Sequence, residues 1–209
     1  AYKRLIAKIR LVSKRCQDVP EEIRKLDKVL LDTYFCNFSV FQSLPDFWAI
    51  DQLFPIMPIH KLNEEPKRKG SLADLSCDSD GKDDCFVNRR GRQSYLSLHE
   101  TGGQPYYLGI FLVGAYQEIL GGMHNLFGDT NAVHVDIDED GKWQINNVVE
   151  GDTIREVLAY VQYNSQDLIE RMRVAIEKSL KNGSLTAEES AKLQKKFKEA
   201  LESYTYLVV

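Results

Sequence analysis

No hydrophobic run in this sequence approaches the roughly 20 apolar residues that a membrane-spanning helix needs. The opening stretch, AYKRLIAKIRLVSKRC, is a basic amphipathic segment that lacks the apolar core of a signal peptide. These absences predict a cytoplasmic protein with no membrane partner. The sequence also begins with Ala1 rather than methionine, and from this we expect a part of a longer polypeptide.

An excess of charge of one sign is missing as well. The sequence has 27 basic and 31 acidic residues, scattered along the chain, and a formal net charge of -4. This balance argues against a nucleic-acid partner, because such a surface concentrates lysine and arginine. The hydrophobic share of 43% and the charged share of 28% are typical of an ordinary folded globular protein.

Cysteine is scarce, and neither cysteine nor histidine follows a known site spacing. There is no CxxC pair and no HxxH or HExxH motif, so we expect neither disulfides nor a structural zinc site. Without such spacing, each histidine is expected to be structural. These residues are Cys16, Cys36, Cys77, Cys85, His60, His99, His124 and His134. The phosphate-binding patterns GxxxxGK[ST] and GxGxxG are also missing.

Helical periodicity marks both ends of the chain. Apolar positions at helical spacing predict a helical lead-in over residues 1–33. From residue 152 the helical period returns, and TIRE and TAEE are capping boxes that predict helix starts near residues 153 and 186. We therefore expect a C-terminal helical segment over residues 152–209.

Residues 34–151 predict a mostly antiparallel β domain. The stretch 34–44 is rich in aromatic and β-branched residues and indicates a buried strand, and the prolines that follow favour an extended course. Residues 107–113 are apolar almost without interruption, which is typical of a strand covered on both faces. The stretch 132–149 alternates like a hairpin with its turn at Asp140-Gly141. The fold class is therefore α+β.

The stretch CDSDG displays one thiol, Cys77, among carboxylates. Gly81 and the neighbouring Asp and Ser residues predict a tight, exposed loop. A free cysteine has a pKa of about 8.5, and nearby carboxylates disfavour the thiolate, so we expect the thiol to keep its proton. A calcium loop of the EF-hand kind would need a closing glutamate at the position of Arg89, so a solvated turn is favoured.

Three other residues stand out. Asp46 and Asp51 lie in an otherwise apolar stretch, where an ionised carboxylate needs a partner. Tyr116 follows an apolar run, where its phenol could be exposed at the edge of a sheet, although a buried tyrosine with a satisfied hydroxyl is the ordinary alternative.

Three motifs resemble the C-terminal part of the biosynthetic arginine decarboxylase family: FQSLPDFWAIDQLFPIMPIHKLNEEP, CDSDGK and PYYLGIFLVGAYQEILGGMHNLFGDTNAVHV. The resemblance implies a pyridoxal 5'-phosphate enzyme of the alanine racemase-like class, which makes agmatine from L-arginine for polyamine synthesis. It further implies an N-terminal (β/α)8 barrel that holds the cofactor, followed by a C-terminal β domain. In that family two subunits pair head to tail, and each β domain completes the partner's active site.

The resemblance also implies roles for individual residues. Cys77 would reprotonate the α-carbon of the substrate after carbon dioxide leaves, and Asp78 would lie beside the cationic end of the substrate. Either Asp46 or Asp51 would be a second substrate-binding carboxylate. Tyr116 would contact the cofactor phosphate, and His124 would face the substrate.

One departure from the family pattern is large. Nothing in the sequence resembles the lysine that binds the cofactor or the glycine-rich phosphate loop, so the cofactor-binding barrel is expected to be largely absent and the chain inactive alone. Its expected partners are the barrel-containing remainder of the enzyme and a second copy, in a dimer or higher oligomer. Mg²⁺ is often associated with the family, but no ligand set for it is evident in the sequence.

Other functions are also compatible with the sequence. A non-catalytic regulatory relative would be expected to have lost the proton donor, and the presence of Cys77, Asp78 and Tyr116 favours an enzyme. A decarboxylase for lysine, ornithine or diaminopimelate is the alternative within catalysis. A purely structural β domain would not need a cysteine in a polar loop.

Overall fold

The computed structural model describes residues 8–9, 31–83, 85–89 and 91–208. These residues fold as two compact units, each assembled from several segments of the chain. Unit 1 contains what is described of residues 1–36, 53–73 and 82–112, and unit 2 contains residues 37–52, 74–81 and 113–209. The helical lead-in expected over residues 1–33 lies almost entirely outside the described residues.

Unit 1 is built around the strand β3 (Arg68–Ala73), which has neighbours along both edges. β3 pairs in parallel with β1 (Asp32–Phe35) and antiparallel with β4 (Lys82–Asp83) and β7 (Leu96–Leu98). Two antiparallel pairs complete the unit: β2 (Ile56–Pro58) with β8 (Leu108–Ile110), and β5 (Phe86–Asn88) with β6 (Gly91–Gln93). The mostly antiparallel prediction is confirmed, with one parallel pair, and the described strands form no closed barrel.

A small apolar cluster and one histidine stabilise unit 1. The cluster consists of the buried side chains of Leu72, Phe86, Leu96 and Leu98. His99 is buried beside it, and both of its ring nitrogens have partners: Nδ1 lies 2.8 Å from the hydroxyl of Tyr106, and Nε2 lies 2.9 Å from the carbonyl oxygen of Glu64. His99 is therefore a structural histidine, as expected.

Unit 2 begins with short helices where the sequence predicted extended chain. The strand prediction for residues 34–44 is wrong beyond Phe35, because α4 (Val40–Ser43) follows and is capped by the side chain of Ser39. Pro45 then begins α5 (Pro45–Ile50), a position where its missing N–H costs nothing. Only β2 keeps the extended course that we expected near Pro55 and Pro58.

The long apolar strand predicted over residues 107–113 is also shorter than expected. β8 ends at Ile110, and Leu112 adopts a left-handed backbone conformation with φ of 60°. Its side chain is 85% exposed, and those of Phe111 and Val113 are also exposed. α6 (Tyr116–Leu120) follows, so Tyr116 lies at the start of a helix rather than at the edge of a sheet.

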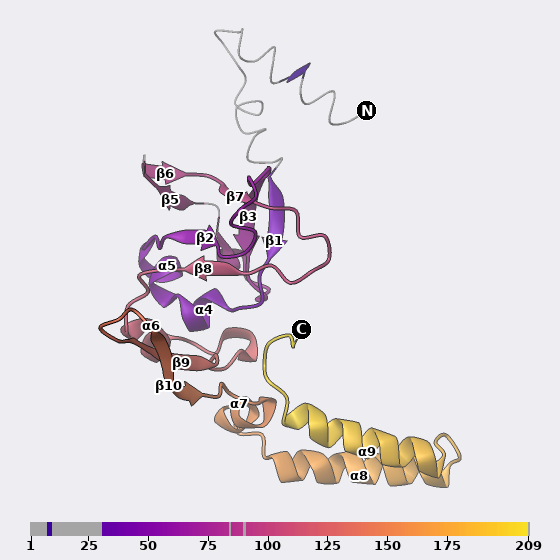
Figure 1. Cartoon of the computed structure of the whole chain (residues 1–209). Helices are drawn as coiled ribbons and strands as arrows, with labels where there is room; N and C mark the ends of the chain where they lie inside the picture. The colour runs from indigo at the N-terminus through magenta and orange to yellow at the C-terminus, as the bar shows by residue number, and fades with distance from the viewer. Residues whose placement is uncertain (1–7, 10–30, 84, 90, 209) are drawn as a thin grey trace. The chain divides into compact units, whose positions relative to one another are not determined.

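The hairpin and the C-terminal helices agree with the sequence prediction. β9 (Ala132–Ile137) pairs antiparallel with β10 (Trp143–Val149), and Gly141 in the turn has φ of 79°. Both predicted capping boxes are present, before α7 (Ile154–Tyr160) and before α9 (Ala187–Leu201). α8 (Ser165–Lys181) and α9 lie side by side (Figure 1). Among the described helices, none combines the length and the apolar character of a membrane span.

The chain end packs against the segment before the hairpin. Tyr206 is buried, donates a hydrogen bond of 2.8 Å to the carbonyl oxygen of Gly128 and stacks on Phe127 with ring centroids 5.1 Å apart. Asn37 and Leu207 exchange two hydrogen bonds, of 2.7 and 2.9 Å. Burial raises the pKa of Tyr206 above the ordinary tyrosine value.

We predict that this tyrosine makes the chain sensitive to alkali. Because its pKa is higher when folded, its contribution to stability is complete below pH about 10 and is lost as the pH rises through the folded value. Tyr206→Phe should lower the free energy of unfolding near pH 8 by about 1 kcal/mol, because the hydrogen bond is lost. Between pH 8 and pH 11 the free energy of unfolding should fall less in this variant than in the unsubstituted chain, because phenylalanine has no proton to lose. Urea denaturation at both pH values measures this.

Tyr163→Phe is the matched control, since Tyr163 is exposed. The prediction would be contradicted if the free energy of unfolding fell equally between pH 8 and pH 11 in the Tyr206→Phe variant and in the unsubstituted chain.

Candidate functional site

Every candidate residue from the sequence lies in unit 2, and the Cys77 loop (residues 74–81) is the centre of the site. The loop is anchored by Asp74, whose side chain is only 3% exposed. Its Oδ2 accepts a hydrogen bond of 2.9 Å from the backbone N–H of Val40, at the start of α4. Its Oδ1 accepts from the backbone N–H and the hydroxyl of Ser76, at 2.9 and 2.6 Å. A buried carboxylate thus has its hydrogen bonds satisfied and holds the loop against α4.

The loop closes on itself at Gly81. The N–H of Asp74 donates to the carbonyl of Gly81 at 2.8 Å, and the N–H of Gly81 donates to the carbonyl of Asp78 at 3.2 Å. A Cβ atom on residue 81 would lie 2.1 Å from Oδ1 of Asp74. Gly81 is required here because the carboxylate occupies the space of a side chain.

Cys77 is exposed, as the sequence predicted, and its thiol contacts Asn125. The side-chain amide of Asn125 donates from Nδ2 to Sγ of Cys77 at 3.3 Å. The backbone N–H of Cys77 donates in return to Oδ1 of Asn125, also at 3.3 Å. The thiol therefore has a defined position although it faces solvent.

Asp78 lies next to His124, which belongs to the short 3-10 helix η2 (His124–Leu126). Oδ2 of Asp78 is 3.8 Å from Nε2 of His124, and both side chains are about 40% exposed. Oδ1 of Asp78 accepts from the N–H of Asp80 at 3.0 Å. The ring of His124 packs on buried Phe41, with centroids 4.3 Å apart. The structure thus brings Cys77, Asp78 and His124 together.

Asp46 of α5 is hydrogen-bonded to Gln117, which follows Tyr116 in α6. Oδ2 of Asp46 accepts from Nε2 of Gln117 at 2.6 Å, and the N–H of Asp46 donates to Oε1 of Gln117 at 3.2 Å. Gln117 is buried, so Asp46 helps to position α6. Tyr116, one residue earlier, is 72% exposed. Asp51 is also exposed, at the left-handed C-terminal end of α5 with φ of 55°.

α4 holds both sides of this site. Asp74 binds its first N–H, and the carbonyl of Phe41 accepts from the N–H of Gly122 at 2.9 Å. The chain passes so close at Gly121 that a Cβ atom there would lie 2.3 Å from the carbonyl oxygen of Gln42. The Gly121-Gly122 pair therefore allows the segment that carries His124 and Asn125 to approach α4.

Sequence reasoning missed two of these residues. Asp74 is one of several acids near CDSDG and has no distinguishing signal in the sequence, although its burial makes it the anchor of the loop. Asn125 carried no signal beyond its place in the glycine-rich stretch GGMHNLFG. Among the described residues, no group of three or more histidine, cysteine, aspartate or glutamate side chains could hold a metal ion.

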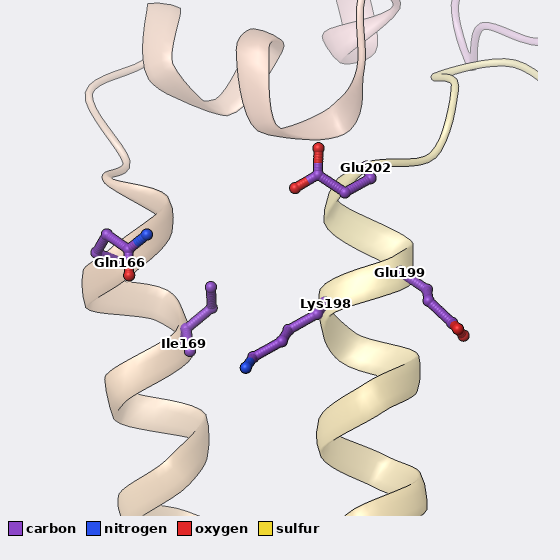
Figure 2. A pocket seen from close by; sticks show the side chains of 5 residues that line it. All are labelled: Gln166, Ile169, Lys198, Glu199 and Glu202. Atoms are coloured by element: carbon purple, nitrogen blue, oxygen red, sulfur yellow. The ribbon is translucent and has the colours of Figure 1, made fainter.

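A shallow hollow of about 540 Å³ lies elsewhere in unit 2, between α8 and α9. Figure 2 shows Lys198 of α9 extending toward α8 across this space. The hollow is lined by Gln166, Ile169, Lys198, Glu199 and Glu202. None of the candidate residues from the sequence lines it, so we do not assign it a role in the site.

Comparisons with known proteins agree with the resemblance found in the sequence. Residues 154–207 match the family model of the arginine decarboxylase C-terminal helical extension. The biosynthetic arginine decarboxylase of Rhodopirellula baltica is 50% identical over 207 residues, which are 99% of this chain and 31% of that protein. The one from Nostoc sp. is 54% identical over 190 residues, 90% of this chain and 28% of that protein.

A solved structure is similar in fold as well. The crystal structure of the biosynthetic arginine decarboxylase SpeA from Campylobacter jejuni has a TM-score of 0.71 and 34% sequence identity, over 89% of this chain and 31% of that one. The chain thus spans about a third of the length of these relatives. These matches confirm the resemblance that the motifs indicated.

We predict that Gly81→Ala disrupts the Cys77 loop. The added methyl group would collide with Asp74 and displace the carboxylate from the N–H of Val40, so the free energy of unfolding should fall by about 1–3 kcal/mol. Gly114→Ala is the control, because a Cβ atom there would meet nothing within 4 Å. Thermal or urea denaturation of both variants measures the difference. Equal stabilities would contradict the prediction, because they would mean that the loop accommodates the methyl group without a loss of stability.

Proposed function

We propose, from the similarity of this chain to the C-terminal part of biosynthetic arginine decarboxylases, that it supplies active-site residues to an enzyme that converts L-arginine to agmatine and carbon dioxide. Because the chain spans about a third of its relatives, the activity belongs to the complete enzyme. The observation that carries the proposal is the exposed thiol of Cys77, held in place beside Asp78 and His124. We further propose that the enzyme acts in polyamine biosynthesis, which uses agmatine, and that it is cytoplasmic.

Cys77 is the proton donor in this proposal. Pyridoxal 5'-phosphate, when bound, accepts the electron pair that remains when carbon dioxide leaves the α-carbon of the substrate. The Sγ–H bond of Cys77 then breaks, its proton passes to the α-carbon, and the sulfur keeps the electron pair as a thiolate. Cys77 suits this step because an S–H group can donate a proton and because it lies on an exposed loop with a defined geometry.

Asp78 binds the guanidinium group of the substrate. Its carboxylate is adjacent to Cys77 along the loop and is partly exposed, so it can accept paired hydrogen bonds from a planar guanidinium. In this proposal His124, whose ring lies beside Asp78, borders the site that the guanidinium group occupies. Asp51 is the better of the two candidates for a second carboxylate, because it is exposed, whereas Asp46 is engaged with Gln117.

Tyr116 is the residue of this chain that fits the cofactor. Its side chain is exposed, and its hydroxyl can donate a hydrogen bond to a phosphate oxygen. One hydroxyl is not a complete phosphate site, so the remaining contacts, and the lysine that binds the cofactor, would come from the barrel-containing remainder. Nothing among the described residues gives a reason to propose Mg²⁺.

The apolar face of the hairpin supports a partner for this chain. Ile137 lies opposite Trp143, and Val135 lies opposite Ile145, so their side chains share one face. All four are more than half exposed, with Ile137 at 72%. A two-stranded hairpin is marginal in water unless such a face is covered. We assign this face to contact with the barrel-containing remainder, and the assembly to a dimer or higher oligomer in which one copy completes the other's site.

A non-catalytic regulatory relative is the second candidate. It would bind a true decarboxylase without donating a proton, and the ordered thiol of Cys77 disfavours it. A decarboxylase for lysine, ornithine or diaminopimelate is disfavoured by the names of the similar proteins, each of which is a biosynthetic arginine decarboxylase.

The assay follows carbon dioxide released from labelled arginine with added pyridoxal 5'-phosphate, for the chain alone and for the chain with its barrel-containing remainder. We expect activity only in the mixture. Cys77→Ala should lower turnover there by a factor of roughly 100 or more and allow faulty protonation, because the proton donor is lost. Ser79→Ala, in the same exposed loop, should leave the rate unchanged. Near-normal agmatine formation by Cys77→Ala would refute the role of the thiol.

A second substitution separates substrate binding from cofactor binding. Asp78→Asn removes the charge that pairs with the guanidinium, so the KM for arginine should rise roughly 10- to 100-fold while the affinity for the cofactor stays the same. Asp80→Asn, a neighbouring exposed carboxylate, is the control. Equal losses of substrate and cofactor affinity would count against the role of Asp78.

A charged substitution tests whether the apolar face of the hairpin contacts the remainder of the enzyme. Ile137→Lys should weaken binding of the remainder at least tenfold, because a buried lysine without a partner is unfavourable. Gln144→Lys is the control, since Gln144 pairs with Asp136 rather than with the apolar row. Binding measured by sedimentation should distinguish the variants, and equal affinities would assign the contact to another face.

A further inference from the structure

We propose that Asn125 is a positioning residue for Cys77: its side-chain amide orients the thiol and stabilises the thiolate that remains after the proton is donated. This inference rests on the proposed function of Cys77. It goes beyond that function because it assigns a role in the chemistry to a residue that no sequence motif indicated.

The two hydrogen bonds between Asn125 and Cys77 run in opposite directions. Cys77 donates its backbone N–H to Oδ1, and Asn125 donates from Nδ2 to Sγ, each over 3.3 Å. A backbone N–H can only donate, so Oδ1 must face it, and the amide group then necessarily directs its N–H toward the sulfur. A side chain with one acceptor and one donor on the same plane is needed to make both contacts.

The backbone of Asn125 is itself held in an unusual conformation. Its φ of 56° and ψ of 23° lie in the left-handed region, which asparagine tolerates better than most residues. The turn around it is closed by hydrogen bonds from Leu126 to Met123, at 2.9 Å, and from His124 to Gly122, at 2.7 Å. The amide is therefore delivered to the thiol by a segment that is fixed independently of Cys77.

The donor from Asn125 acts on the charge that the sulfur acquires in the reaction. Nδ2 of Asn125 lies 3.3 Å from Sγ of Cys77. Asp74, Asp78 and Asp80 lie on the same loop, and His124 lies on the facing segment beside Asp78. An N–H aimed at the sulfur stabilises the negative charge that develops there during proton transfer.

Two variants separate this role from folding. Asn125→Gly keeps the left-handed backbone accessible and removes the amide. Asn125→Asp keeps an acceptor for the N–H of Cys77 but replaces the donor with a negative charge. Circular dichroism and thermal denaturation check that both variants fold.

The first readout is the pH dependence of Cys77 alkylation by iodoacetamide in this chain, followed by mass spectrometry of the Cys77 peptide. We expect the midpoint of the alkylation profile to move up by about one pH unit in Asn125→Asp, and by less in Asn125→Gly. The profile of Cys85 in the same sample should not move. An unchanged Cys77 profile in both folded variants would overturn the proposal.

The second readout is turnover of arginine by the complete enzyme. Asn125→Gly should lower kcat roughly tenfold with little change in KM, and should have no further effect when Cys77 is already alanine. An additional loss in that background would show that Asn125 does not act through Cys77 and would overturn the proposal. Failure of the proposed function would look different: Cys77→Ala alone would then retain activity, whatever the alkylation profile.

Discussion

The buried carboxylate of Asp74 is the interaction on which the site depends. It accepts three hydrogen bonds, from the N–H of Val40 and from the N–H and hydroxyl of Ser76, and it occupies the space that a side chain on Gly81 would need. A carboxylate without these donors would be costly to bury, so the loop conformation and the burial require each other. The exposed thiol of Cys77 owes its position to this hidden residue.

The short helix α4 extends this constraint to the other half of the site. Its first N–H holds the Cys77 loop, while Phe41 holds Gly122 through its carbonyl and His124 through its ring. Both segments therefore take their positions from the same few residues. This explains how two loops with little core of their own can hold a thiol, a carboxylate and an imidazole in a defined arrangement.

The proposed chemistry also explains what unit 2 leaves exposed. Tyr116 and the apolar row of the hairpin are far more exposed than an isolated protein would favour. The relatives that match this chain are about three times as long. Their additional residues could pack against such exposed faces. In the proposed function the cofactor is held by the remainder of the enzyme, and the proposed contributing residues Cys77, Asp51 and Tyr116 are exposed, as such a role requires.

The sequence by itself determined the hairpin and the capped C-terminal helices, because turn residues, capping boxes and alternation act between near neighbours. It also singled out Cys77 as a thiol in a polar loop, whereas Asp78 became a candidate through the resemblance to arginine decarboxylases. The tertiary structure alone decided that residues 40–43 and 45–50 are helical, that Asp46 is engaged with Gln117, and that Asn125 contacts the thiol. These outcomes depend on groups far apart in the sequence: Asp74 contacts Val40 across 34 positions, and Asn125 contacts Cys77 across 48. No local pattern encodes such contacts, since they form only when the chain has folded.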